Sequence, residues 1–159
     1  MKTIILFASI AIASGLLLTN IYTSLIDARS WGSDIPHSIA TAREYFKTVN
    51  PGNFFRIFSP VNQLLGIIVL LLFWKTSAAI RINLGIALLM YLVAEGLTFM
   101  YFYPRNDIMF KTAALTDIAL LKQTWAQWNT MNWVRSAVLL TGIIFSSLSL
   151  HKWYLLQFK

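Results

Sequence analysis

Two ionisable residues, Glu95 and Arg135, stand inside stretches of sequence that are otherwise apolar. Glu95 lies eight residues before the end of the stretch 84–103, and Arg135 lies seven residues into the stretch 128–150. At about 1.5 Å of helix per residue, both lie roughly 10 to 12 Å below the same end of their helices. A lone charge inside a membrane is costly, so we expect both side chains to face the protein interior and to pair, directly or through one water. Such residues are candidates for a functional site.

Uncharged polar residues extend this candidate site along four apolar stretches. They recur at helical spacing, so each stretch carries a polar stripe near the same end. The stripes comprise Asn20, Thr23 and Asp27; Ser59, Asn62, Gln63 and Gly66; Tyr91, Thr98 and Phe102 beside Glu95; and Trp128, Asn132 and Ser146 beside Arg135. Four such helices would line a pocket. The alternative is that these groups only join the helices, as Asn, Ser and Thr often do in membrane proteins.

The four apolar stretches have the length of transmembrane helices. They cover residues 4–26, 54–74, 84–103 and 128–150, and a bilayer core requires roughly 20 helical residues. The first begins with Lys2 like a secretory signal peptide, but its apolar run continues past the cleavage-like residues 11–13, so we expect an uncleaved span. The sequence therefore predicts an all-α integral membrane four-helix bundle that forms a single domain over residues 1–159.

Two long connections, 28–53 and 105–127, join these stretches and each shows the pattern of a short amphipathic helix. Their apolar positions are Ile39, Ala42, Phe46 and Val49 in the first, and Leu115, Ile118 and Trp125 in the second. We expect both helices to lie at the membrane interface, above the polar end of the bundle.

Composition narrows the possible functions. The chain is 57% hydrophobic and only 12% charged, which is too apolar for an ordinary soluble domain. It has no cysteine, which excludes disulfides and thiol chemistry. The net charge of +7 comes from scattered basic residues, so we expect the lipid bilayer as partner and no nucleic acid. His37 and His151 fall at opposite membrane faces, so no metal site is predicted.

Four polar motifs follow one another along the chain. They are Asn20-x-Tyr22, Ser59-Pro60-Val61-Asn62, Tyr103-Pro104-Arg105-Asn106 and Trp125-x-x-Trp128-Asn129-x-x-Asn132-x-x-Arg135. In this order they resemble the anthrone-oxygenase-like family of small four-span membrane proteins, over most of the chain. Many members are bacterial, so the resemblance implies a bacterial inner membrane. It also implies a cofactor-free oxygenase, because fungal members oxidise polycyclic anthrones to anthraquinones.

The resemblance implies a role for each candidate residue. An electron-rich carbanion reacts with dioxygen once a base has removed a proton, so the protein needs a base, an anion-stabilising group and an aromatic pocket. Glu95 would be the base and Arg135 the anion stabiliser, with no cofactor. In binding a small lipophilic aromatic ligand, Asn62 and Asn132 would orient its oxygen atoms, and Tyr22, Tyr101 and Trp128 would stack on it. The polar stripes add Asn20, Gln63 and Thr98 to the predicted substrate-binding residues. A Glu95 paired with Arg135 would be a weak base, however, so a purely structural pair is an alternative.

Three kinds of function therefore stay open. The first is a membrane enzyme or lipophile-binding protein, and the second is a non-catalytic membrane subunit that uses the polar stripes for assembly. A proton or solute pathway is the weakest, because polar residues do not continue through the stretch 64–74. A cavity separates the first two, since an enzyme needs an aromatic-lined space of roughly 300 Å³ or more. The substrate and the oligomeric state stay open.

We predict that both termini are cytoplasmic. The side that holds the termini and the connection 75–83 carries basic residues and no acidic one, as cytoplasmic loops do. In spheroplasts, a membrane-impermeant thiol reagent should label Asp34→Cys and leave Ala78→Cys unlabelled, with no native cysteine to interfere. Labelling of position 78 but not of position 34 would show the opposite orientation.

Overall fold

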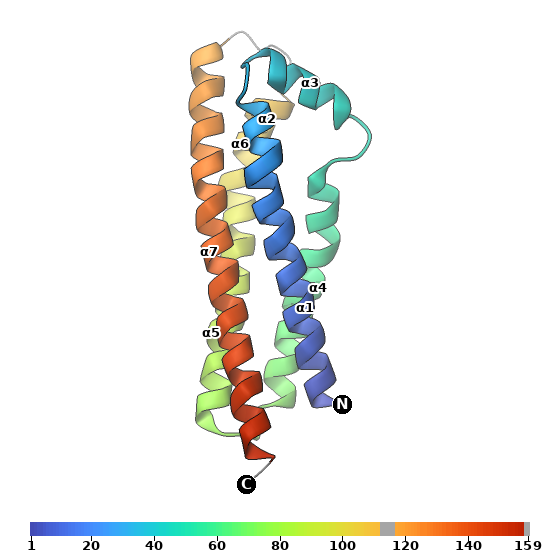
Figure 1. Ribbon diagram of the computed structural model, residues 1–159, viewed down its shortest axis with the longest axis vertical. Coiled ribbons are helices and arrows are strands. Elements are labelled where there is room, and N and C mark those ends of the chain that lie inside the picture. Colours follow the sequence, from blue (N-terminus) through green and yellow to red (C-terminus); the bar gives the residue numbers. More distant parts are fainter. Residues whose placement is uncertain (112–116, 158–159) are drawn as a thin grey trace.

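The computed structural model describes residues 1–111 and 117–157, and this part of the chain is an all-helical bundle (Figure 1). The elements are α1 (Lys2–Tyr22), the π-helical segment η1 (Thr23–Asp27), α2 (Ala28–Trp31), α3 (His37–Tyr45), α4 (Pro51–Leu72), α5 (Ala78–Leu97), the π-helical segment η2 (Thr98–Phe102), α6 (Tyr103–Phe110) and α7 (Ile118–Leu156). The predicted all-α four-helix bundle is confirmed.

In the described part of the chain, four continuous helical runs are long and apolar enough to cross a membrane. They are Lys2–Trp31, Pro51–Leu72, Ala78–Phe110 and Ile118–Leu156. Large apolar side chains such as Leu18, Leu64 and Leu71 are more than half exposed along them. A surface of this kind is expected where lipid, rather than water, surrounds the helices. Length and composition thus indicate an integral membrane protein.

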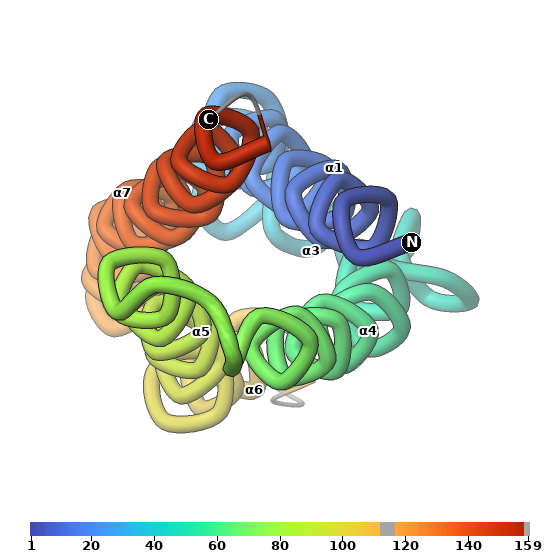
Figure 2. Tube along the Cα trace, turned by 90° about the horizontal axis from the view of Figure 1, so that it is seen from below, coloured from blue at the N-terminus to red at the C-terminus, as the bar shows by residue number. Residues whose placement is uncertain are grey.

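The helices form a ring in the order α1, α4, α5, α7, as the view along the bundle in Figure 2 shows. In this ring α1 packs on α4 and α7, and α5 packs on the same two helices from the other side. Successive long helices run in opposite directions, so both termini lie at one end of the bundle and α3 lies at the other (Figure 1). The candidate site lies in the half of the bundle near α3, which we name the outer half.

Local sequence explains where the helices begin. Asn50 caps α4 by accepting a hydrogen bond from the Gly52 amide at 2.9 Å, and Pro51 occupies the first helical position, where its missing N–H costs nothing. Asp117 caps α7 in the same way, with its carboxylate 2.9 Å from the Leu120 amide. From Ile118 to Leu156 there is no proline, so α7 continues as one helix of 39 residues.

The two long connections differ from each other. The first contains α3, which confirms the predicted short helix, and Ile39 and Ala42 are the buried residues of this helix. The second was expected to hold a separate interfacial helix, and that prediction is wrong for Ile118 and Trp125, which belong to the first turns of α7. The apolar stripe there is continuous with that of the fourth span, so it packs as one helix. Leu115 lies outside the described residues.

A close contact joins α5 and α7 just below the candidate site. The Tyr91 ring lies against Gly142, where an added Cβ would be only 2.5 Å from the ring atom Cε1. The Tyr91 hydroxyl lies 3.2 Å from Ser146 Oγ, one turn further along α7. Glycine therefore makes room for a buried aromatic ring between two helices, as small residues do in membrane bundles.

We predict that Gly142→Ala lowers the thermal stability of the purified protein, because its Cβ would collide with the buried Tyr91 ring. Overpacking of this kind costs about 1–3 kcal/mol. Gly85→Ala is the matched control, since an added Cβ there meets no atom within 4 Å, and it should raise stability by about 0.5–1 kcal/mol. Melting in detergent, followed by tryptophan fluorescence, compares them. An equal response of the two variants would contradict the close contact.

Candidate functional site

Arg135 lies on α7 in the outer half of the bundle, with only 6% of its surface exposed. Two asparagine side chains hold its guanidinium. Nε donates to Asn20 Oδ1 at 2.9 Å, and Nη2 donates to both Asn20 Oδ1 and Asn132 Oδ1, the latter at 2.8 Å. Nη1 donates to Thr98 Oγ1 at 3.3 Å. Neutral oxygens thus replace the water that a buried cation has lost.

The same two asparagines bind each other in a reciprocal way. Asn20 Nδ2 donates to the Asn132 carbonyl at 2.9 Å and to Ser136 Oγ at 2.7 Å. Asn132 Nδ2 donates to the Asn20 carbonyl at 3.1 Å and to Ser24 Oγ at 2.7 Å. Each serine follows its asparagine by one helical turn, so the antiparallel first and fourth spans present the same pair to one another. We name these four residues the asparagine–serine clasp.

The clasp aims its oxygens at Arg135. An amide side chain has two N–H donors and one oxygen, and the contacts between the two spans use both donors of each asparagine. Only the oxygens are left for the guanidinium. Phe102 and Phe55 add aromatic faces, with ring centres 4.1 and 5.0 Å from the guanidinium carbon, which stabilise a cation further.

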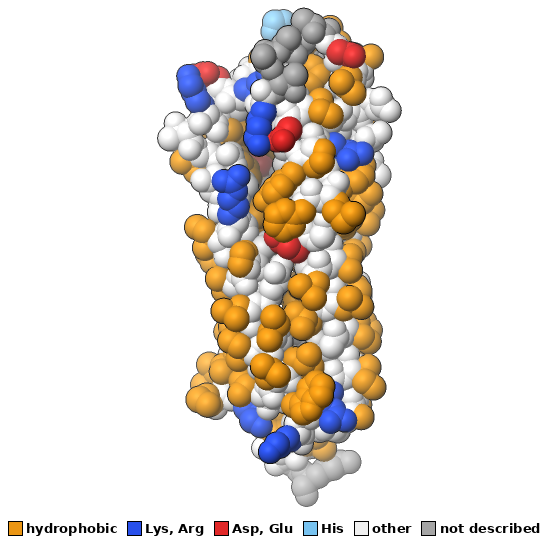
Figure 3. Space-filling model, turned by 180° about the vertical axis from the view of Figure 1, so that it is seen from behind, with side chains coloured by type: hydrophobic (Ala, Val, Ile, Leu, Met, Phe, Trp, Pro, Cys, Tyr) orange, Lys and Arg blue, Asp and Glu red, His pale blue; other side chains and the backbone are white. Residues whose placement is uncertain are grey.

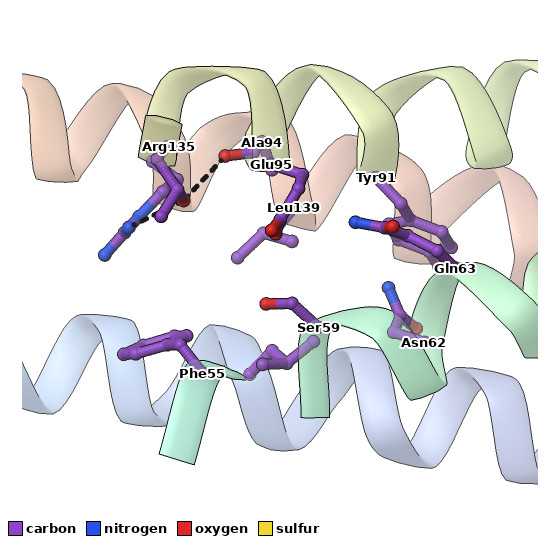
Figure 4. A pocket seen from close by; sticks show the side chains of 11 residues that line it. Phe55, Ser59, Asn62, Gln63, Tyr91, Ala94, Glu95, Arg135 and Leu139 are labelled. Carbon is purple, nitrogen blue, oxygen red and sulfur yellow. Dashed lines mark hydrogen bonds between the residues drawn. The ribbon is translucent and has the colours of Figure 1, made fainter. Parts of the chain in front are cut away.

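Glu95 lies on α5 beside Arg135 but does not bind it directly. Ser59 and Gln63 of α4 lie close to the Glu95 carboxyl, and Arg135 is near enough to attract it electrostatically. Figure 4 shows the Glu95 side chain directed toward Ser59, with the Arg135 guanidinium to one side. The direct form of the expected pair is therefore not formed between these two described residues, because the clasp already surrounds the guanidinium.

A cavity of about 550 Å³ opens beside these two residues, between α4 on one side and η2 and α6 on the other. Glu95, Thr98, Arg135 and Ser59 line its inner end. Its aromatic lining consists of Trp31, Phe46, Phe55, Tyr103, Phe110 and Trp128. In Figure 3, basic and acidic side chains gather around a hollow in the upper part of the molecule, above a long apolar surface. The volume of the cavity lies within the range of about 300–1,000 Å³ that is usual for a small-molecule site.

A much smaller cavity of about 20 Å³ lies deeper, where Asn62, Gln63 and Tyr91 approach Glu95 (Figure 4). Asn62 is 2% exposed, and its Oδ1 atom has no hydrogen-bond partner among the described residues. A space of this size holds about one water molecule. The polar stripe of α4 therefore continues inward from Glu95.

The short helices α3 and α6 cover the outer end of the large cavity. Arg43 of α3 donates from Nε to the Met109 carbonyl of α6 at 2.7 Å, and the Trp128 indole donates to Asn106 Oδ1 at 2.8 Å. Partial burial lowers the pKa of Arg43, but an arginine starts so far above neutrality that it stays charged. Hydrogen bonds thus join α3 to α6 and α6 to α7.

The structure brings most of the predicted site residues close together, but only some of them line a cavity. Glu95, Arg135, Thr98 and Trp128 line the large cavity, and Asn62 and Gln63 line the small one beside Glu95. Asn20 and Asn132 are fully buried in the clasp, so they position Arg135 and are not among the residues that line either cavity.

Tyr22 and Tyr101 are not brought to the site. Tyr22 is 57% exposed on the outside of the bundle, because it lies two positions after Asn20 and two positions along a helix turn a side chain to nearly the opposite face. Tyr101 packs under the Arg105 guanidinium, 3.4 Å from the ring centre, and its hydroxyl donates to the Gln127 carbonyl. It belongs to η2, whose wider turn rotates the following side chains. Their positions do not support the predicted stacking on a ligand.

Sequence reasoning missed several residues of the site. Ser24 and Ser136 complete the clasp, and the signal was present as an Asn-x-x-x-Ser spacing that occurs in both the first and the fourth span. The two π-helical segments were also missed, although η1 carries Ser24 and η2 carries Thr98. Such segments are frequent at functional sites, but no local residue pattern predicted these two.

Comparison with known proteins finds no match: no family model matches the sequence, and no curated protein or solved structure is significantly similar to it. Within residues 1–111 and 117–157, no three His, Asp or Glu side chains lie together as a metal ion would require. Fold and site together define an integral membrane four-helix bundle with a partly charged, aromatic-lined cavity in its outer half.

We predict that Asn20→Ala lowers the free energy of unfolding by about 2–3 kcal/mol, because it removes the oxygen that accepts two hydrogen bonds from a buried cation. Ser136→Ala removes one neutral partner and should cost about 1 kcal/mol or less. Thr141→Ala is the control, since its exposed hydroxyl bonds only a carbonyl of its own helix. Unfolding in mixed detergent micelles measures all three.

A double variant tests whether the clasp acts through Arg135. Arg135→Met should restore part of the stability lost in Asn20→Ala, because it removes the charge that has lost its acceptors. If the double variant is no more stable than Asn20→Ala alone, the clasp does not act through Arg135.

Proposed function

We propose that this chain is a membrane-embedded enzyme or lipophile-binding protein that takes up a flat, electron-rich aromatic ligand in the 550 Å³ cavity. The observation that carries the proposal is the inner end of that cavity, where Glu95 and Arg135 both face the same space without being directly paired. Aromatic side chains line the remainder. An apolar space with a few convergent polar groups is the usual form of a small-molecule site.

Access from the membrane supports a lipophilic ligand. The cavity lies between the first two turns of α4 and the helix α6, and apolar side chains cover the surface below it (Figure 3). Ile57 and Val61, which are on α4 next to lining residues, are exposed on the outside of the bundle. A ligand dissolved in the bilayer would reach the site between α4 and α6.

The resemblance to anthrone oxygenases supplies the proposed reaction, in which an anthrone and dioxygen give an anthraquinone and water. Glu95 removes a proton from the carbon that joins the rings, and the carbanion's electron pair forms a C–O bond with dioxygen. The peroxide anion takes the proton back from Glu95 and becomes a hydroperoxide. Glu95 then removes the remaining proton from the same ring carbon, and the C–H electron pair forms the C=O bond as the O–O bond breaks. The leaving hydroxide takes that proton and departs as water. Dioxygen is thereby the oxidant, and the chain supplies only a base and an anion-stabilising group.

The geometry supports these two roles. Because Arg135 has the clasp as its direct partner, Glu95 is not held in an ion pair that would weaken it as a base. Arginine has five N–H donors, and the clasp and Thr98 account for four of them. The fifth is available to the anionic oxygen of the substrate.

The second candidate is a non-catalytic membrane subunit. The clasp favours it, because Asn20 and Asn132 use every amide donor to join two helices and are thus packing residues in this structure. In this alternative the cavity would receive a segment of a partner protein instead of a small molecule. Binding of a small aromatic ligand separates the two.

We predict that the purified protein accelerates oxygen consumption by a hydroxylated anthrone, with or without a chelator. Glu95→Gln should lower the rate by about 100-fold or more, because proton abstraction is lost, while the Kd for the ligand changes little. Glu44→Gln is the control, since it removes an exposed carboxylate that does not line the cavity. An oxygen electrode and a binding titration give both quantities.

Two results would count against this function. If several anthrones cause no oxygen uptake, or if a chelator abolishes it, the cofactor-free oxygenase is excluded and ligand binding alone remains. If Glu95→Gln loses binding and turnover equally, Glu95 shapes the cavity and is not the base.

A further inference from the structure

The lining of the large cavity is strongly basic. Five basic side chains, Arg43, Lys47, Arg56, Lys111 and Arg135, line it together with two acidic ones, Glu95 and Asp107. Arg135 and Glu95 are at the inner end, so the other basic groups all belong to the outer end. An excess of positive charge in a partly enclosed, low-dielectric space attracts anions more strongly than the same charges would on an open surface.

Two of the outer basic groups have structural partners. Lys111 Nζ lies 2.7 Å from Asp107 Oδ1, and Arg43 binds the last carbonyls of α6. Arg56 differs from them, because no hydrogen bond or ion pair joins it to another described residue although it lines the cavity. Among the residues that the structure describes, the Lys47 ammonium contacts only the exposed carboxylate of Glu44, at 3.3 Å. Arg56 and Lys47 are therefore the cations best able to bind a ligand.

The position of Arg56 along α4 indicates how a ligand would be oriented in the cavity. Arg56 precedes Ser59 by three residues, which places it roughly 4.5 Å further out along the helix. Ser59 faces Glu95 at the inner end, and Lys47 comes before the first turn of α4. A ring system lying beside Phe55, with its reacting carbon at Glu95, would extend its far end toward Arg56 and Lys47.

We propose that the natural ligand carries an acidic group, a carboxylate, sulfonate or phosphate, at the end remote from Glu95, and that Arg56 and Lys47 bind it. The orientation of the rings rests on the proposed function. The inner end is unsuitable for such a group, because the Glu95 carboxyl is there and the clasp holds most donors of Arg135. Charge-assisted hydrogen bonds at the outer end would provide both affinity and orientation.

The test compares two probes that differ by one anionic sulfonate group, anthraquinone and anthraquinone-2-sulfonate, in nanodiscs of zwitterionic phosphatidylcholine. Trp31 and Trp128 line the cavity, so quenching of tryptophan fluorescence reports binding. We expect the sulfonate to bind about tenfold more tightly, as two partly exposed ion pairs would allow. The advantage should shrink at about 0.5 M salt, where charges are screened.

Variants assign the effect to residues. Arg56→Gln should remove most of the sulfonate's advantage and Lys47→Gln part of it, while affinity for neutral anthraquinone stays the same. Arg56→Lys keeps the charge and should retain part of the advantage, which also shows that position 56 tolerates substitution. Arg29→Gln is the matched control, because Arg29 is an exposed arginine on α2, at the same end of the bundle, that does not line the cavity.

The outcomes are distinct. Equal affinity for the two probes, or an advantage that survives in the Arg56→Gln, Lys47→Gln double variant, would overturn this inference and leave the proposed function standing. Binding of neither probe would overturn the proposed function as well. Nanodiscs that contain phosphatidylglycerol identify the source of the acidic group. Competition with the sulfonate would indicate a lipid headgroup, and its absence a free acidic lipophile.

Discussion

The outer half of the bundle is organised around the guanidinium of Arg135, a residue with only 6% of its surface exposed. A buried cation is tolerated only where protein groups replace its hydration, and here three spans contribute to that task. Asn20 and Asn132 provide oxygens from the first and fourth spans, Thr98 from the third, and Phe102 an aromatic face. The position of Arg135 thus sets how these helices are rotated toward one another.

The clasp and the contact between Tyr91 and Gly142 do not include α4, which packs on α1 and α5. The clasp joins the first and fourth spans, and the contact of Tyr91 with Gly142 joins α5 to α7. The end of the bundle near the termini is closed by apolar packing of Leu6, Phe73 and Ile80, all of them fully buried. At the other end the first turns of α4 leave space, and the cavity occupies it. A rigid frame on three sides is what a pre-organised site requires.

The polar residues of the four stripes divide into two tasks. Asn20, Asn132, Ser24 and Ser136 join helices, while Glu95, Ser59 and Thr98 face a cavity. Structural and functional interpretations of such residues are therefore not exclusive, because the joining groups hold Arg135 where the cavity can use it. Arg135 connects the two sets, being bound on one side and available on the other.

The sequence by itself determined the four spans, the depth of Glu95 and Arg135, and the end of the bundle at which polar residues gather. These follow from the length of apolar runs and the cost of burying charge, which are local properties of the chain. Only the tertiary structure decided which groups touch. Helical spacing gives directions around one helix, whereas a contact depends on how two helices are rotated against each other, and the π-helical turns of η1 and η2 change that rotation. For this reason Arg135 has asparagine rather than Glu95 as its direct partner, and Tyr22 and Tyr101 lie away from the cavity.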